Sequence, residues 1–143
     1  MIDIPYPYLI HTNRELAMML EGKKPLAAFC DVHPKNHDAE VIPEQDFAPY
    51  VKTGTFIKRE HITAGSPHGT RRVLYALPNE EWRINAYLLL WETAEKVGWN
   101  EGFERMEGRL LGYDEWQNDF HIDNRFKKHL PHFDSEIPKA ETG

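Results

Sequence analysis

The stretches TFIKREHIT, residues 55–63, and TRRVLYAL, residues 70–77, decide the fold class. Both are rich in β-branched and aromatic residues, and the connection between them, residues 64–69, contains glycine and proline. Two such runs around a turn-forming connection are typical of a β-hairpin. The sequence therefore predicts an antiparallel hairpin near residues 55–77.

At least one more strand is expected before this hairpin. Residues 26–32, LAAFCDV, form an apolar run that is too short for a typical helix and fits a buried strand. Pro5 and Pro7 keep the N-terminus extended, so the pattern also allows an edge strand towards Ile10. We expect a small antiparallel sheet of three to four strands.

A helix is expected between the N-terminus and the first strand. Thr12 and Glu15 have the spacing of a capping box, and Gly22 supplies a helix stop. From residue 33 to about residue 53 the sequence shows no clear periodicity. A segment of this length without regular structure is often functional, or it hides an element that the pattern does not reveal.

Three helices are expected after the hairpin. Residues 80–97 form the most apolar segment, with apolar side chains around most of the circumference, which is typical of a buried helix. Asn100 caps a second helix, residues 101–111, and Asp114 caps a third. A run of strands followed by a run of helices indicates an α+β fold. We expect one domain, 1–130, and a flexible tail, 131–143.

Composition and charge narrow the classes of function. The 143 residues carry a net charge of −6, and all of that excess lies in residues 78–143. An acidic chain is a poor match for nucleic acid, because binding to phosphates draws its affinity from Lys and Arg. With one cysteine, no secretory signal and no long apolar run, the sequence predicts a cytoplasmic protein without a membrane segment.

A cluster of metal-ligating residues lies where the first strand ends. Cys30, His33 and His37 are donors that zinc or another divalent metal accepts, and Asp31 or Asp38 would be a ligand or a general base on metal-bound water. This pattern is compatible with a small metal-dependent hydrolase. The alternative is that Cys30 lies in the sheet core, since free cysteines are often buried. Apart from such a metal, no cofactor is expected.

The hairpin is the one basic part of the chain. Lys58 and Arg59 lie in its first strand, and Arg71 and Arg72 lie in its second. If the four side chains converged, they would form a site for phosphate or nucleic acid. The alternative is a charged edge that prevents aggregation.

The acidic C-terminal half is also rich in aromatic residues, which favour protein interfaces when exposed. The candidate contact residues are Trp99, Glu101, Glu104, Glu107, Tyr113 and Trp116. Since the chain lacks a phosphate-binding glycine loop and a nucleophile elbow, the leading hypothesis is a non-catalytic protein-binding or regulatory protein. Its partner would be another protein, and a homo-oligomer is compatible with the same surface.

Overall fold

The computed structural model describes residues 4–128, and the tail expected at 131–143 lies outside them. The strands are β1 (Leu26–His33), β2 (Ile57–Thr63) and β3 (Gly69–Ala76). The helices are α1 (Glu15–Leu20), α2 (Glu44–Lys52), α3 (Trp82–Val97), α4 (Glu101–Leu111) and α5 (Glu115–His121), with a 3₁₀ turn η1 (Pro78–Glu80) and a π-helical turn η2 (Ile122–Phe126). This arrangement is the small α+β fold that the sequence predicts.

The strands form one antiparallel sheet in the order β1-β3-β2. The central strand, β3, pairs on both sides, so that Ala76 lies opposite Leu26 of β1 and opposite Ile57 of β2. Its residues 73–76 are 0% exposed, because helices cover both faces of the sheet at this point. The hairpin and the preceding strand are confirmed. The segment before α1 does not join the sheet, so the edge strand towards Ile10 is not formed.

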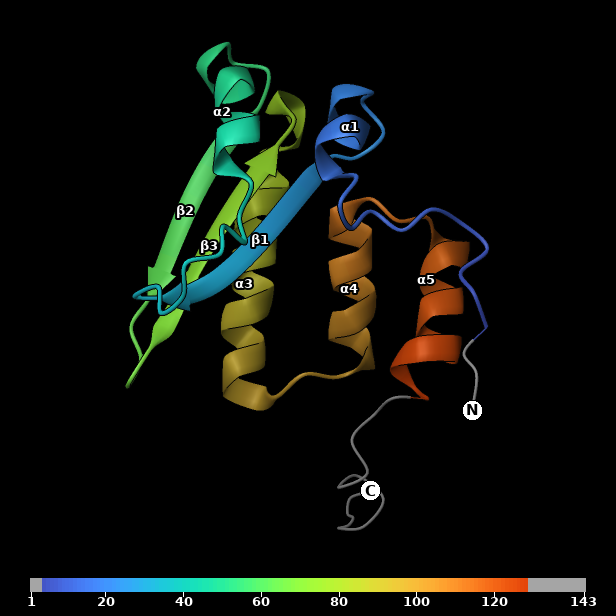
Figure 1. Ribbon diagram of the computed structural model, residues 1–143. Helices are drawn as coiled ribbons and strands as arrows, with labels where there is room; N and C mark the ends of the chain where they lie inside the picture. Colours follow the sequence, from blue (N-terminus) through green and yellow to red (C-terminus); the bar gives the residue numbers. More distant parts are fainter. Residues whose placement is uncertain (1–3, 129–143) are drawn as a thin grey trace.

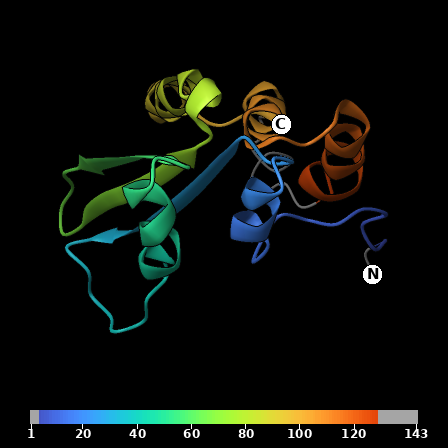
Figure 2. The same ribbon diagram turned by 90° about the horizontal axis from the view of Figure 1, so that it is seen from above.

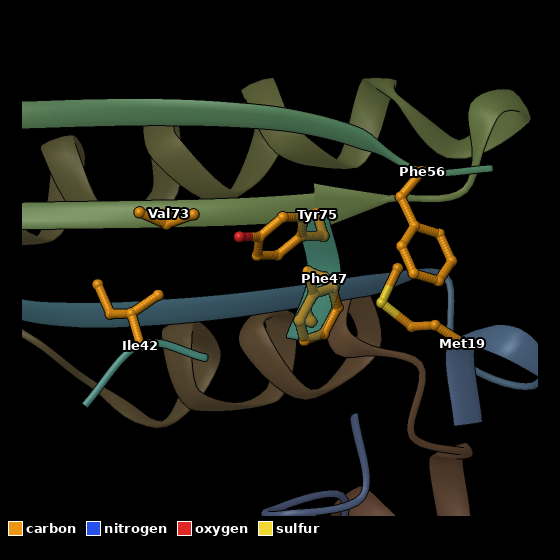
Figure 3. Close-up of a cluster of buried hydrophobic side chains, with 7 residues drawn as sticks. Met19, Ile42, Phe47, Phe56, Val73 and Tyr75 are labelled. Atoms are coloured by element: carbon orange, nitrogen blue, oxygen red, sulfur yellow. The ribbon is translucent and has the colours of Figure 1, made fainter. Parts of the chain in front are cut away.

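One face of the sheet packs against α1 and α2 (Figure 1). Phe47 of α2 stacks on Tyr75 of β3, with 4.2 Å between the ring centroids. Most of the buried side chains of this cluster are drawn in Figure 3, and its members are Met19, Ala27, Ile42, Phe47, Phe56, Val73 and Tyr75.

The other face of the sheet packs against α3 and α4. The buried side chains of this second cluster are Leu26, Leu74, Ala76, Ile84, Tyr87, Leu90 and Leu110. Both views place α4 between α3 and α5, so α5 lies beside α4 and away from the sheet (Figures 1 and 2). The three C-terminal helices therefore form one layer, of which α3 and α4 cover the sheet.

The region from residue 33 to residue 53 contains a helix that the sequence pattern did not reveal. Phe47 is the one fully buried residue of α2, and with the half-buried Tyr50 and Val51 it forms a short apolar stripe that faces the sheet. Pro49 lies inside the helix and masks this helical pattern. Packing of these three apolar side chains against the sheet core holds the short helix in place.

The capping box expected at the start of α1 is wrong. Asn13 adopts the left-handed backbone conformation with φ of 67°, and the N-cap residue is Arg14, without a side-chain cap. A tertiary contact holds the segment that leads into α1 instead: the backbone amide of His11 donates to the Tyr113 hydroxyl at 2.8 Å. The cap expected at the start of α4 is confirmed: Asn100 Oδ1 accepts a hydrogen bond from the amide of Phe103 at 2.9 Å.

Candidate functional site

The residues predicted to bind metal do not converge on one point. Successive side chains of a strand alternate between faces, so Cys30 lies on the opposite face of the sheet from Asp31 and His33. Only His37 and Asp31 meet, with 2.9 Å between Nε2 and Oδ1, and this hydrogen bond lowers the pKa of Asp31. Asp38 is exposed in the following loop. Within residues 4–128, no group of three or more His, Cys, Asp or Glu side chains is arranged to hold a metal ion.

Cys30 itself is exposed, so the expectation of a cysteine in the sheet core is wrong. The reason is that the second half of β1 extends past the helices. Its first two residues, Leu26 and Ala27, are buried, whereas Cys30 and Val32 reach the surface.

The basic residues of the hairpin are divided between the two faces of the sheet. Lys58 and Arg71 lie on the α2 face, and both bind Glu44. Lys58 Nζ lies 3.0 Å from Glu44 Oε1, and Arg71 donates two hydrogen bonds to the same carboxylate at 2.7 and 3.0 Å. Arg71 is the main reason that the pKa of Glu44 falls to about 2. Arg71 also contacts Glu60, so two carboxylates already balance the charges of these two cations.

The other two hairpin cations lie on the α3 face. Arg59 donates to Glu81 Oε2 at 3.0 Å and to Asn85 Oδ1 at 2.7 Å. The Arg72 guanidinium lies over the ring of Trp91, 4.3 Å from its centroid. The four cations therefore do not form the single anion site considered from the sequence.

The six residues of the predicted partner surface also separate. Glu104 and Glu107 point towards the fold interior, where they line a cavity. Trp99 stacks on Trp91 with 4.4 Å between centroids. Tyr113 likewise stacks on His11, at 3.7 Å.

Two of the six remain on the surface. Trp116 is 52% exposed, and Glu101 is exposed with Lys127 at 3.8 Å. The acidic aromatic surface expected from the sequence is therefore not continuous.

A cavity of about 250 Å³, here called the inner cavity, lies between the N-terminal segment and α4 and α5. Its lining side chains are mostly aromatic or acidic. They are Tyr6, Tyr8, Ile10, Thr12, Glu104, Glu107, Gly108, Leu111, Tyr113, Asn118 and His121. Because the N-terminal segment comes from the far end of the chain, sequence spacing alone does not reveal this cavity.

The two carboxylates of the inner cavity have different surroundings. Glu104 accepts hydrogen bonds from Trp99 Nε1 at 2.7 Å and contacts His121 Nε2 at 2.6 Å, and the bond to His121 lowers the pKa of Glu104. Glu107 accepts from the Tyr87 hydroxyl at 2.8 Å, and burial raises its pKa. Two neighbouring carboxyls with pKa values pushed in opposite directions are a feature of functional sites.

A second concave surface, here called the outer groove, runs between α3 and α4 on the side away from the sheet. It has a volume of about 470 Å³. Its lining side chains are nearly all apolar: Trp82, Ala86, Leu89, Leu90, Thr93, Phe103, Met106, Arg109 and Leu110. Trp82 is 56% exposed, Leu89 61% and Met106 48%, so the groove presents large apolar side chains to solvent.

The outer groove corrects one expectation from the sequence. The apolar side chains around α3 predict burial on all sides. In the structure the sheet covers one side and α4 covers a second, but no described residue covers the side that carries Trp82 and Leu89. The apolar circumference of α3 therefore includes an exposed apolar surface.

Basic side chains border the outer groove. The Arg83 guanidinium lies over the ring of Trp82, 4.7 Å from its centroid, and Arg109 lines the groove. Lys96 is exposed one helical turn after Thr93 and so lies on the same side of α3. Arg83 is paired with Glu80 at 2.7 Å and Arg109 with Glu115 at 2.5 Å, so two of these three rim cations already have a carboxylate partner.

These features define a small α+β protein whose three-stranded sheet is covered by helices and whose outer helical layer carries an open apolar groove. Searches of family models, curated proteins and solved structures each found no match to the chain. Across residues 4–128, no helix has both the length and the apolar character needed to cross a membrane.

Proposed function

We propose that this chain is a protein-binding module, and that the outer groove holds an amphipathic helix of a partner protein. The observation that carries this proposal is the uncovered apolar side of α3, with Trp82 and Leu89 more than half exposed. An apolar stripe of this kind costs free energy in water, and covering it on binding recovers that cost. The proposal keeps the protein-binding hypothesis but moves the contact surface.

The shape and composition of the groove support a helical ligand. A groove between two packed helices accepts the apolar face of a third helix, with anchor residues at positions i, i+3, i+4 and i+7. Trp and Met, here Trp82 and Met106, are enriched at the centres of protein interfaces. We therefore expect large aliphatic anchors on the partner helix.

The charges at the rim select the flanking residues of that helix. Of the cations that border the groove, Lys96 forms no ion pair within the described residues, so a carboxylate beside the apolar stripe of the partner is favoured over an ammonium group at that end of the groove. Charges at a rim change specificity and association rate more than affinity. The favoured occupant is thus a helix with a leucine-rich face and acidic flanks.

Two synthetic helices test this proposal. Each has about 18 residues and the same leucine stripe, and they differ only in carrying Glu or Lys on the flanks. We expect the Glu-flanked peptide to shift the fluorescence of Trp82 with micromolar affinity, and the Lys-flanked peptide to bind at least about tenfold more weakly. A Trp82→Phe variant shows how much of the fluorescence change comes from Trp82.

Two results would overturn this assignment. One is that neither peptide binds, or that both bind equally well. The other comes from sedimentation velocity of the free protein: a dimer that dissociates on Leu89→Asp would assign the groove to a second copy of the chain.

A further inference from the structure

We propose that the inner cavity binds a small primary ammonium cation. The proposal rests on the carboxylates, the amide oxygen of Asn118 and the aromatic rings that line this one cavity, and it does not depend on the outer groove. The volume of about 250 Å³ is below the range of drug-sized pockets, so the ligand is a short alkylamine.

The charge of the cavity lining favours a cation. Glu104 and Glu107 lie one turn apart on α4, and both line the cavity. Among the described side chains of the lining, His121 is the only one that can carry a positive charge, and it is already bound to Glu104. A buried carboxylate is unfavourable unless a cation or a hydrogen-bond donor compensates it. Among the described residues, Glu107 accepts one hydrogen bond, from the Tyr87 hydroxyl, whereas Glu104 already has two partners, so Glu107 is the carboxylate with more remaining capacity for an ammonium group.

A second, independent feature is Asn118, which lines the cavity and is only 4% exposed. Its Nδ2 donates to the Tyr113 carbonyl at 3.5 Å, but no hydrogen bond to its Oδ1 is formed within the described part of the chain. This oxygen is therefore available to accept a hydrogen bond from a ligand in the cavity. A primary ammonium group carries three donors, so it has donors for both Glu107 and Asn118.

Gly108 supports the same wall of the cavity. A Cβ atom at this position would lie 2.0 Å from Asn118 Oδ1, so any other residue would displace the Asn118 amide. The Asn118 amide oxygen therefore packs against the backbone of α4 at Gly108, where a side chain would take its place. Its position is fixed by α4 and α5 together.

The aromatic side of the cavity also suits a cation. Tyr6, Tyr8 and Tyr113 line it, and their hydroxyls are already hydrogen-bonded within the fold at 2.8–2.9 Å. The remaining ring surfaces attract cations through their quadrupoles. One such contact is present: the Arg125 guanidinium lies 4.1 Å from the centroid of the Tyr6 ring.

The surroundings of Glu107 are compatible with binding a cation. Burial raises the pKa of Glu107, and the nearby Glu104 raises it further. An ammonium group beside this carboxyl would stabilise its ionised form and reverse that shift.

The test uses n-butylammonium chloride and its neutral isostere 1-butanol, titrated into the full chain by calorimetry. We expect butylammonium to bind with a dissociation constant below about 1 mM and 1-butanol to bind at least about tenfold more weakly. Equal binding of the two compounds, or no heat from butylammonium, would overturn the proposal. This comparison needs no variant, so it stands even if a substitution in the cavity impairs folding.

Matched variants then locate the site. Glu107→Gln keeps an acceptor for the Tyr87 hydroxyl but removes the charge, and we expect it to weaken butylammonium binding by about tenfold. Glu101→Gln changes an exposed carboxylate of the same helix that does not line the cavity, and should leave the affinity unchanged. Binding that is insensitive to Glu107→Gln, or that is lost equally in both variants, would contradict the assignment.

Discussion

Phe47→Ala should lower the free energy of unfolding by about 3–5 kcal/mol, the range observed when a buried Phe is truncated. Phe47 is 1% exposed, stacks on Tyr75, and is the only buried residue of α2. Its removal leaves a cavity against the sheet and detaches the helix that rests on it. Urea denaturation followed by circular dichroism measures the loss.

The control for this prediction is Val41→Ala. Val41 precedes the same helix but is 51% exposed, so its truncation should change stability by less than about 0.5 kcal/mol. A loss below about 1 kcal/mol for Phe47→Ala would show that α2 contributes little to the core. That result would contradict the packing described for this face of the sheet.

Leu89→Asp should weaken binding of the Glu-flanked peptide by at least about thirtyfold, equivalent to about 2 kcal/mol. Leu89 lines the outer groove on α3 and is 61% exposed, so the new carboxylate would lie on the apolar surface that the peptide covers. The same carboxylate would repel the acidic flanks of the peptide. Fluorescence titration of Trp82 measures the change in affinity.

The folded protein should tolerate this substitution. A mostly exposed Leu contributes little to the core, and the lower helix propensity of Asp costs less than about 1 kcal/mol. Leu20→Asp is the matched control, because Leu20 is 45% exposed on α1 and lies outside the groove. If Leu20→Asp reduces peptide binding as much as Leu89→Asp, the effect is not specific to the groove.

Local patterns in the sequence predicted much of the fold. The hairpin follows from β-branched runs around a turn, and Asn100 was predicted as a cap from its position before an amphipathic helix. These features depend on neighbouring residues, so spacing along the chain is enough to find them. The helix α2 has only a short apolar stripe, made of Phe47, Tyr50 and Val51, and the internal proline obscures it, so local spacing does not predict this helix.

The candidate sites depended still more on long-range packing. Glu104 and Glu107 looked like surface charges because α4 is amphipathic and acidic, yet the N-terminal segment encloses them with Tyr6 and Tyr8. Their separation from those tyrosines along the chain hides the inner cavity from sequence analysis. The outer groove lies on the apolar circumference of α3, for which the sequence predicts complete burial.

The most direct test of the protein-binding proposal is methyl NMR of the chain as the Glu-flanked peptide is added. The proposal predicts that shifts are concentrated on Ala86, Leu89 and Met106, which line the outer groove, while Ile10 in the inner cavity stays unchanged. Shifts at Ile10 with none in the groove, or no shifts at saturating peptide, would contradict it.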